Sequence, residues 1–265
     1  MSVKNNLKLY CVYHDKELET HYNHTKYWFK PYYKPLVENE WFKLYYTKEG
    51  HENSLDAVQD YFCEFTAMYW IYKNNLYSPY IGLCHYGRQR LRAVMEQQDF
   101  KDIEILGKFE DWGSLKSGTK ESGPIMERYN NYLLEEFFDF IKTNYDKDSR
   151  IYRYFITNYD KPVKILPNIN FITKWEYFYE ITKCLSDFFD YDDKINNLNW
   201  EHDNYTKYIT DKWINKKDFA PCYLPHSQEW YLVSPDSNRY RIYSYIIEVF
   251  VGYYFGNLKA ELNGE

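Results

Sequence analysis

The order of hydrophobic and polar residues divides the chain into short apolar runs and longer stretches with a helical period. Residues 7–13 (LKLYCVY) form an apolar run after a polar lead and predict a first, central strand. Between residues 56 and 74 apolar side chains recur in a four-three-four-three spacing, which predicts one amphipathic helix with Ser54 as its N-cap. A second apolar run at residues 80–84 predicts a buried strand that ends abruptly at polar residues.

The second half of the chain alternates between helical stretches and irregular ones. The apolar period predicts helices at residues 128–144, 174–190 and 239–258, and an extended element at residues 165–172 that two asparagines interrupt. Residues 100–124 contain four glycines, so they predict either a long loop that closes over a ligand or a plain surface loop. No Pro-, Gly- or Ser-rich linker divides the chain, which favours one α/β domain.

A cluster of polar side chains follows the predicted strand at residues 80–84. Its members are His85, Tyr86, Arg88, Arg90 and Arg92. Open α/β sheets bind their ligands outside the carboxyl ends of their strands, so this cluster stands where a ligand is expected.

Aromatic residues are the unusual feature of the composition. The 265 residues include 32 Tyr, 17 Phe and 8 Trp, so 22% of the chain is aromatic and the core must be built largely of rings. Many tyrosine hydroxyls then need a hydrogen-bond partner or a wet edge. The bias toward Lys, Asn and Tyr indicates an A/T-rich genome, such as that of a phage or a low-GC bacterium.

The charge balance and the cysteines exclude several classes of protein. A formal charge of -6, from 33 basic and 39 acidic residues, argues against broad, non-specific nucleic-acid binding but leaves a local basic groove open. The five cysteines are widely spaced and form no C-x-x-C pair, so they indicate neither a zinc site nor a disulfide framework. No stretch approaches the roughly 20 apolar residues of a membrane span, and the N-terminus lacks an apolar signal segment. We therefore expect a cytoplasmic protein.

Two adjacent segments resemble the signature of a protein family. FCEFTAMYWIYKN and YIGLCHYGRQR are similar to a helix "C/Y-E-L-T-A-x-Y-W-x-W-K-N" followed by "Y-x-G-L-x-H-Y-R-R". This is the pattern of a domain-of-unknown-function family found in bacterial capsule and exopolysaccharide gene clusters. The matching positions are Glu64, Thr66, Ala67, Tyr69, Trp70, Lys73, Asn74, Gly82, Leu83, His85, Tyr86 and Arg88. The chain departs from the pattern at Gly87, where the family has an arginine for which Arg90 and Arg92 would have to compensate.

Two further segments resemble the family in its order along the chain. KLYCVYHDK is similar to an opening strand that ends in His-Lys, which here are His14 and Lys16. LPNINFITK is similar to an "N-M-F-I-M-K" strand, whose asparagine maps to either Asn168 or Asn170.

The segment RYRIYSYIIEVF looks like the closing "R-x-x-G-F-x-x-E-R-L" helix of the family, with Arg241 and Glu248 in matching places and Val249 instead of the second arginine. The resemblance thus covers nearly the whole chain. It implies a single GT-A-like domain whose mixed, mostly parallel central sheet is flanked by helices. It also implies a nucleotide-sugar-binding half at about residues 1–125, an acceptor-side half at about 126–265, and a glycosyltransferase that uses a nucleotide-diphosphate sugar, with a UDP-sugar as the expected donor.

The chemistry of such a transfer needs positive charge or hydrogen-bond donors at the departing diphosphate. Most GT-A enzymes bind a divalent metal with an Asp-x-Asp after a central strand, whereas the corresponding strand here ends in the sequence HYGR. The resemblance therefore assigns the diphosphate to Arg88, Arg90 and His85, and leaves dependence on a divalent metal open. An Asp-x-Asp occurs at Asp190 and Asp192, at the tail of a predicted helix, and is either a metal site or a solvated helix end.

We expect the donor to be bound by residues from all of these segments, namely His14, Lys16, His85, Tyr86, Arg88, Arg90, Asn168, Asn170 and Arg241. The candidates for acid–base chemistry are Glu64, Glu248 and His85. Each assignment has a structural alternative, such as an internal ion pair for Glu64 or a pair on one helix face for Arg241 and Glu248.

Three functions are compatible with the sequence. The first is transfer of a sugar to a hydroxyl of a polysaccharide or a lipid-linked glycan. The second is a phage enzyme that glycosylates hydroxymethylcytosine in DNA and has to extrude this base from the duplex. The third is a non-catalytic protein that binds a nucleotide sugar or a glycan, which the altered His-Tyr-Arg-Arg and the missing strand-end Asp-x-Asp favour. The sequence does not predict the oligomeric state.

Overall fold

The computed structural model describes residues 2–13, 38–47, 49–85, 90–109, 112–116, 118–119, 131–166, 169–211 and 242–265. The chain forms two compact units. The first contains Met1–Lys108 and Ile169–Thr182, and the second contains Phe109–Asn168 and Lys183–Glu265. Each unit is therefore built from two separate segments of the chain.

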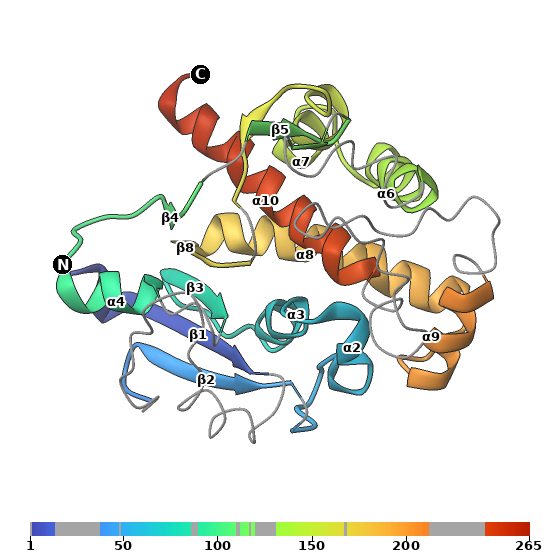
Figure 1. Cartoon of the computed structure of the whole chain (residues 1–265), viewed down its shortest axis with the longest axis horizontal. Coiled ribbons are helices and arrows are strands. Elements are labelled where there is room, and N and C mark those ends of the chain that lie inside the picture. The colour runs from blue at the N-terminus through green and yellow to red at the C-terminus, as the bar shows by residue number, and fades with distance from the viewer. Residues whose placement is uncertain are drawn as a thin grey trace, which may run out of the picture. The chain divides into compact units, whose positions relative to one another are not determined.

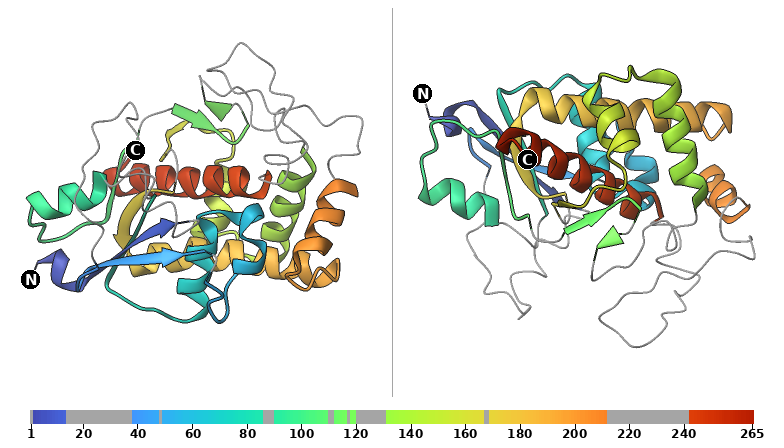
Figure 2. Two further views of the ribbon diagram at one scale, coloured as in Figure 1. Left: turned by 60° about the horizontal axis from the view of Figure 1, so that its bottom comes forward. Right: turned by 90° about the horizontal axis from the view of Figure 1, so that it is seen from above.

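The first unit is built around a five-stranded sheet with the strand order β2-β1-β3-β8-β4 (Figure 1). Its strands are β1 (Leu7–Tyr13), β2 (Phe42–Tyr46), β3 (Tyr80–His85), β4 (Ile105–Gly107) and β8 (Phe171–Lys174). β1 is parallel to both β2 and β3, whereas β8 is antiparallel to both β3 and β4. Three neighbouring strands thus run in one direction, and β1 and β2 can be followed side by side in Figure 2.

One face of this sheet carries a core of aliphatic, cysteine and aromatic side chains, with Tyr13 and Phe42 among them. Leu9 and Cys11 of β1 pack there together with Cys84 of β3. Leu91 and Met95 of α4 (Arg90–Gln97) belong to the same cluster, so α4 covers this face. A short 3-10 helix, η1 (Val3–Asn6), precedes β1.

The rings of Tyr10 and Tyr45 lie on the opposite face of the sheet, because successive residues of a strand point to opposite sides. The ring of Trp70 in α3 (Phe65–Lys73) lies 5.9 Å from the ring of Tyr10 and 4.9 Å from that of Tyr45. Burial, with the nearby charge of Glu38, raises the pKa of Tyr10 to about 12, so this hydroxyl stays protonated.

The helix predicted over residues 56–74 is broken in the structure, so this prediction is wrong. The segment forms η2 (Asp56–Val58) and α2 (Gln59–Phe62), and α3 begins only at Phe65. The break falls at Cys63, whose φ of 45° and ψ of -124° lie outside the helical region. A residue with positive φ cannot continue a right-handed helix, although the apolar spacing on either side of it is helical.

The second unit is mainly helical and has a small sheet. Its helices are α6 (Asn131–Asn144), α7 (Arg150–Tyr152), the π-helix η3 (Arg153–Thr157), α9 (His202–Ile209) and α10 (Ile242–Asn263). Helix α8 (Trp175–Ile195) begins in the first unit and ends in the second. The three-stranded sheet has the order β6-β5-β7, formed by β5 (Trp112–Ser114), β6 (Gly118–Thr119) and β7 (Val163–Lys164).

Helix α10 packs closely against its neighbours in the second unit. Phe250 stacks on Phe137 of α6 with ring centroids 4.2 Å apart. Gly252 and Gly256 are four residues apart and therefore lie on one side of the helix. The backbone of residues 164–166 approaches this side so closely that a Cβ atom on either glycine would collide with a carbonyl oxygen.

The predicted fold class is confirmed, since the chain is α/β with a mixed central sheet flanked by helices. The helices predicted at residues 128–144, 174–190 and 239–258 correspond to α6, α8 and α10 with shifted ends. The prediction of a loop at residues 100–124 is wrong for its described part, because pairing with neighbouring strands produces β4, β5 and β6 there. The extended element predicted at residues 165–172 overlaps β8 only at its end.

The division into a donor half and an acceptor half that meet at about residue 125 stays a prediction.

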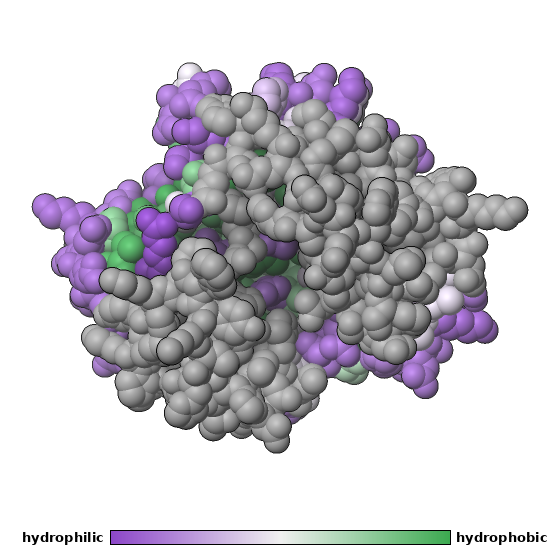
Figure 3. Space-filling model, viewed as in Figure 1, coloured by the Kyte–Doolittle hydropathy of each residue, from purple (hydrophilic) through white to green (hydrophobic). Residues whose placement is uncertain are grey.

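On the face drawn in Figure 3 the described surface residues are mostly hydrophilic. None of the helices in the described ranges is both long enough and apolar enough to cross a bilayer.

Gly82, in β3, provides a test of the packing of the first sheet. An added Cβ would lie 2.6 Å from the carbonyl oxygen of Phe171, 2.7 Å from a side-chain carbon of Ile172 and 3.0 Å from one of Leu9. We expect Gly82→Ala to lower the free energy of unfolding by about 1–3 kcal/mol in urea denaturation, because the neighbouring backbone must shift. Gly264→Ala is the control, since nothing lies within 4 Å of its added carbon and its only cost is the positive φ of 74°. A loss no larger than that of the control would contradict this packing.

Candidate functional site

The carboxyl ends of three parallel strands meet at one edge of the first unit, which we call the strand-end edge. β1 ends at Tyr13, β2 at Tyr46 and β3 at His85. In the register of the sheet Tyr13 lies beside Tyr46, and Val12 lies beside His85. The amide of Thr47 donates to the carbonyl of Tyr13 at 2.9 Å and continues the pairing by one residue.

A fourth strand brings an asparagine to the same edge. Because β8 is antiparallel to β3, it begins where β3 ends, and Phe171 pairs with Leu83. Asn170 directly precedes Phe171 and is half-buried. The structure thus places the backbones of Asn170 and His85, two of the predicted site residues, at one edge of the sheet.

Helix α2 is attached to this edge by a buried polar contact. The hydroxyl of Thr47 donates to Oε1 of Gln59 at 3.1 Å, and the Gln59 amide in turn donates to Asp60. Glu64 follows α2 after the break at Cys63 and is the N-cap residue of α3, where the helix dipole favours a negative charge. Its assignment as a catalytic base stays a prediction.

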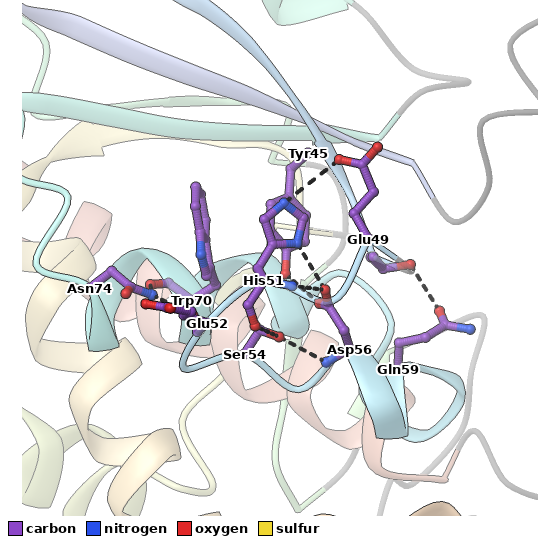
Figure 4. Close-up of polar contacts among 10 residues, drawn as sticks. Tyr45, Glu49, His51, Glu52, Ser54, Asp56, Gln59, Trp70 and Asn74 are labelled. Carbon is purple, nitrogen blue, oxygen red and sulfur yellow. Dashed lines mark hydrogen bonds and ion pairs between the residues drawn. The ribbon is translucent and has the colours of Figure 1, made fainter.

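His51, in the loop after β2, pairs with Asp56 at the start of η2, and no motif in the sequence predicted this pair (Figure 4). Oδ2 of Asp56 accepts two hydrogen bonds from His51, one from Nδ1 at 2.8 Å and one from the backbone amide of His51 at 2.9 Å. Oδ1 of the same carboxylate accepts the hydroxyl of Tyr45 at 2.7 Å. The imidazole stacks on the Tyr45 ring at a centroid distance of 4.6 Å and lies 5.2 Å from the Trp70 ring. One carboxylate therefore orients both the imidazole and the phenol.

The contacts of this pair fasten the loop after β2. Burial and the hydrogen bond to Asp56 raise the pKa of Tyr45, so its hydroxyl remains a donor. The other ring nitrogen of His51, Nε2, lies 3.9 Å from the carboxylate of Glu49, and the His51 side chain is 22% exposed. The side-chain amide of Asn74, at the end of α3, donates at 3.0 Å to the backbone of the same loop. These contacts place the pair beside α3.

Of the predicted arginine cluster the structure describes Arg90 and Arg92, and these two lie in different surroundings. The guanidinium of Arg92 is buried, with its centre 4.4 Å from the centre of the Phe42 ring, and its Nε donates to Glu96 at 3.1 Å. Arg90 is the first residue of α4 and is exposed. Side chains two residues apart on a helix point in different directions, so Arg90 and Arg92 do not face the same way. Because Arg92 is buried in the core, it cannot replace the arginine that the family has at position 87. Arg90 stays a candidate.

The remaining predicted donor-binding residues lie outside the described ranges, and they are His14, Lys16, Tyr86, Arg88, Asn168 and Arg241. In sequence the first two follow β1 closely, and the next two follow β3. Glu248 is a half-buried residue of α10, in the second unit. The functional assignments of all these residues stay predictions.

The Asp-x-Asp sequence, Asp190 to Asp192, lies within α8. The carboxylate of Asp192 accepts hydrogen bonds from tyrosine hydroxyls. Asp192 is 6% exposed. Its Oδ1 accepts the hydroxyl of Tyr208 at 2.8 Å, and its Oδ2 accepts that of Tyr243 at 3.1 Å. Among the residues that the structure describes, no three His, Cys, Asp or Glu side chains are grouped as a metal ion would require. The contacts of Asp192 are those of an acceptor for buried hydroxyls.

Known proteins with similarity to this chain include a domain family and a larger enzyme. The model of a family described as "Domain of unknown function (DUF4422)" matches residues 18–185. No match was found among curated proteins. The apo structure of WbbM, a bifunctional glycosyltransferase, is similar to 97% of this chain at 14% identity and a TM-score of 0.47. The similarity covers 43% of the WbbM chain, so this chain spans less than half of that protein.

Asp193, in the second unit, carries a pH-dependent part of the stability. Burial, together with the negative charges of Asp190 and Asp192, raises the pKa of its carboxyl above the ordinary value. Hydrogen bonds from the Trp200 amide at 2.8 Å and the Tyr205 hydroxyl at 3.2 Å oppose this shift only in part. The folded state therefore holds the proton more firmly than the unfolded state. The contribution of Asp193 to stability is present below about pH 4 and decreases as the pH rises.

We predict that Asp193→Asn becomes more stable relative to the wild type as the pH is raised from about 3 to about 7. The amide oxygen keeps the two acceptor positions, while the buried charge is lost. Urea unfolding at a series of pH values measures this difference. The exposed Asp148→Asn is the control and should follow the wild type throughout. If the stability difference between Asp193→Asn and the wild type stays constant or shrinks with rising pH, the pKa of Asp193 is not raised in the folded state.

Proposed function

The chain belongs to the family described as a domain of unknown function (DUF4422), and from this premise we propose that it is a glycosyltransferase. It transfers a sugar from a nucleotide-diphosphate donor, expected to be a UDP-sugar, to an acceptor hydroxyl. The expected acceptor is a polysaccharide or a lipid-linked glycan. The resemblance of its helix–strand segment to a capsule and exopolysaccharide signature supports this choice of reaction.

The observation that carries the proposal is the convergence of chain segments at the strand-end edge. Three parallel strands end there and β8 begins there, so the segments that follow β1, β2 and β3 start close together. Ligands of open α/β sheets bind at such an edge. The segments after β1 and β3 contain the sequences HDK and YGR, which supply the residue types that bind phosphate oxygens.

The departing diphosphate is the group that needs most stabilisation in this reaction. Negative charge grows on it as its bond to the anomeric carbon breaks, and preformed positive groups stabilise that charge. We assign Arg88 and Arg90, with His85, to the diphosphate. We assign His14 and Lys16 to the nucleotide side of the donor. Since the whole chain has a formal charge of -6, the positive charge at the site has to be local.

The acceptor hydroxyl attacks the anomeric carbon and gives its proton to a base. Glu64 is the first candidate for this base. It follows the backbone turn at Cys63, and backbone in such sparsely populated regions tends to occur at functional sites. Glu248 is the second candidate. Asn170, at the strand-end edge, is assigned to hydroxyls of the transferred sugar.

Arg88→Ala is the mutation that tests the proposal. We expect it to lower the release of UDP from the donor by at least about 10²-fold, because the developing charge loses its main partner. The melting temperature should not change. The assay follows UDP release from a panel of UDP-sugars, with and without a glycan acceptor and with and without a divalent cation.

Lys142→Ala is the matched control for charge. The ammonium of Lys142 lies on α6 in the second unit, is 51% exposed and pairs with Asp139 at 3.1 Å. Its removal should leave UDP release unchanged. Full turnover by Arg88→Ala would remove this residue from the diphosphate site. If the wild type released no UDP from any donor, a non-catalytic binding protein would be the better reading of this fold.

A further inference from the structure

Two tyrosines are the exposed large hydrophobic side chains among the described residues of the first unit. Tyr77, between α3 and β3, is 62% exposed, and Tyr179, on α8, is 39% exposed. The half-buried Trp175 connects them, with its ring 5.5 Å from that of Tyr77 and 6.1 Å from that of Tyr179. The ring of Tyr72 lies 5.3 Å from the ring of Tyr179 on α8. We call these four residues the aromatic row. Single exposed rings are common on protein surfaces, whereas a contiguous row indicates a binding surface.

The backbone fixes the position of the aromatic row. Asn75, just after α3, has a φ of 49°. The amides of Asn75 and Leu76 donate to carbonyls in the last turn of α3 at 3.1 and 3.0 Å, which are the two hydrogen bonds of a Schellman motif. The amide of Trp175 donates to the carbonyl of Pro79 at 3.1 Å. Tyr77 is therefore attached at both ends of a short link, and the start of α8 is tied to the same link.

The polar groups beside the aromatic row are mainly carboxylates. Glu176 directly follows Trp175 and is exposed. Asp102 and Glu104, whose side chains are 60% and 39% exposed, both pair with Lys174, the residue before Trp175. The ammonium of Lys174 lies 3.6 Å from Asp102 and closer to Glu104, so its charge is already balanced. Carboxylates accept hydrogen bonds from hydroxyl groups and repel anions.

We propose that the aromatic row binds an uncharged glycan chain. One face of a sugar ring consists of C–H bonds that pack against the negative face of an aromatic ring, and its hydroxyls donate to carboxylates at the rim. Lys73 adds a second ammonium, 5.7 Å from the centre of the Tyr72 ring. With Glu180, which follows Tyr179, four acidic groups and two basic ones adjoin the row along the chain or pair with Lys174. This balance disfavours ligands that carry phosphate groups.

The aromatic row is too small for a stable protein partner. A specific protein interface buries about 800 Å² on each side, usually around a tightly packed apolar core. Two exposed tyrosines and two half-buried rings supply only a part of this area. No large aliphatic side chain is exposed among the residues described for this unit.

The aromatic row and the strand-end edge lie at opposite ends of the sheet. Tyr80, the first residue of β3, pairs with Lys174 beside the row, whereas the last residue of β3 is His85. A strand of six residues is about 20 Å long. A glycan on the row is therefore held away from the proposed reaction centre. Glycan binding by the row goes beyond the proposed transfer reaction and does not depend on it.

Affinity electrophoresis of the full chain tests this proposal. The protein is run through native gels that contain a neutral polysaccharide (dextran, mannan or a galactan) or the anionic polysaccharide alginate. At least one neutral polysaccharide should retard the wild type. The double variant Tyr77→Ala, Tyr179→Ala should lose at least about tenfold in affinity, because stacking rings contribute most of the contact. Its melting temperature and its UDP release without acceptor should not change, since both side chains are exposed and far from the strand-end edge.

Tyr191→Ala is the matched control, because this tyrosine of α8 lies in the second unit and is 54% exposed. It should migrate like the wild type in every gel. Three results would each overturn the proposal: no retardation by any neutral polysaccharide, equal retardation of the double variant and the wild type, or retardation by alginate alone. Self-association in light scattering that the double variant abolishes would instead assign the row to a second copy of this chain.

Discussion

The parallel pairing of β1 with both β2 and β3 is the constraint on which the first unit depends. Strands that run in the same direction cannot be joined by a tight turn, so the connection from β2 to β3 has to cross a face of the sheet. The connection from β2 to β3 carries α2 and α3, with Trp70 against the face of Tyr10, and the chain after β3 carries α4 to the face of Leu9 and Cys11. The same pairing collects the three carboxyl ends at one edge. Gly82 then allows β8 to approach β3, and this brings Asn170 to that edge.

Buried tyrosine hydroxyls impose a second constraint, which follows from the composition. Carboxylates serve as their acceptors: Asp56 for Tyr45, Asp192 for Tyr208 and Tyr243, Asp193 for Tyr205, and Glu261 for Tyr154. Burial and these carboxylates raise the pKa of every one of these hydroxyls, so they remain protonated donors. The need for acceptors accounts for Asp192 and Asp193 at the end of α8. From the sequence alone, the Asp-x-Asp at this place is compatible with a metal site as well. An aromatic core of this kind uses acidic residues as hydrogen-bond acceptors for its tyrosines.

Elements marked by a clear apolar run, such as β1 and β3, or by a regular apolar period, such as α6, α8 and α10, were predictable from the sequence. The break at Cys63 was not, because the apolar spacing stays helical on both sides while the backbone leaves the helical region. At the site, the position of His85 at a strand end was predictable, since an apolar run stops there. The direction of Arg92 was not, because it depends on the residue at which α4 begins. The pairing of His51 with Asp56 was missed because tertiary contacts with Tyr45 and α3 select it, and no local pattern records them.

The central claim is that a nucleotide diphosphate binds at the strand-end edge. Hydrogen–deuterium exchange of the full chain with and without UDP, read by mass spectrometry, tests it most directly, since a bound ligand slows local opening. The account predicts slower exchange in peptides that cover residues 10–16 and 83–90, and no change in residues 131–144 of α6. Unchanged exchange in the first two peptides, or protection confined to the second unit, would contradict it.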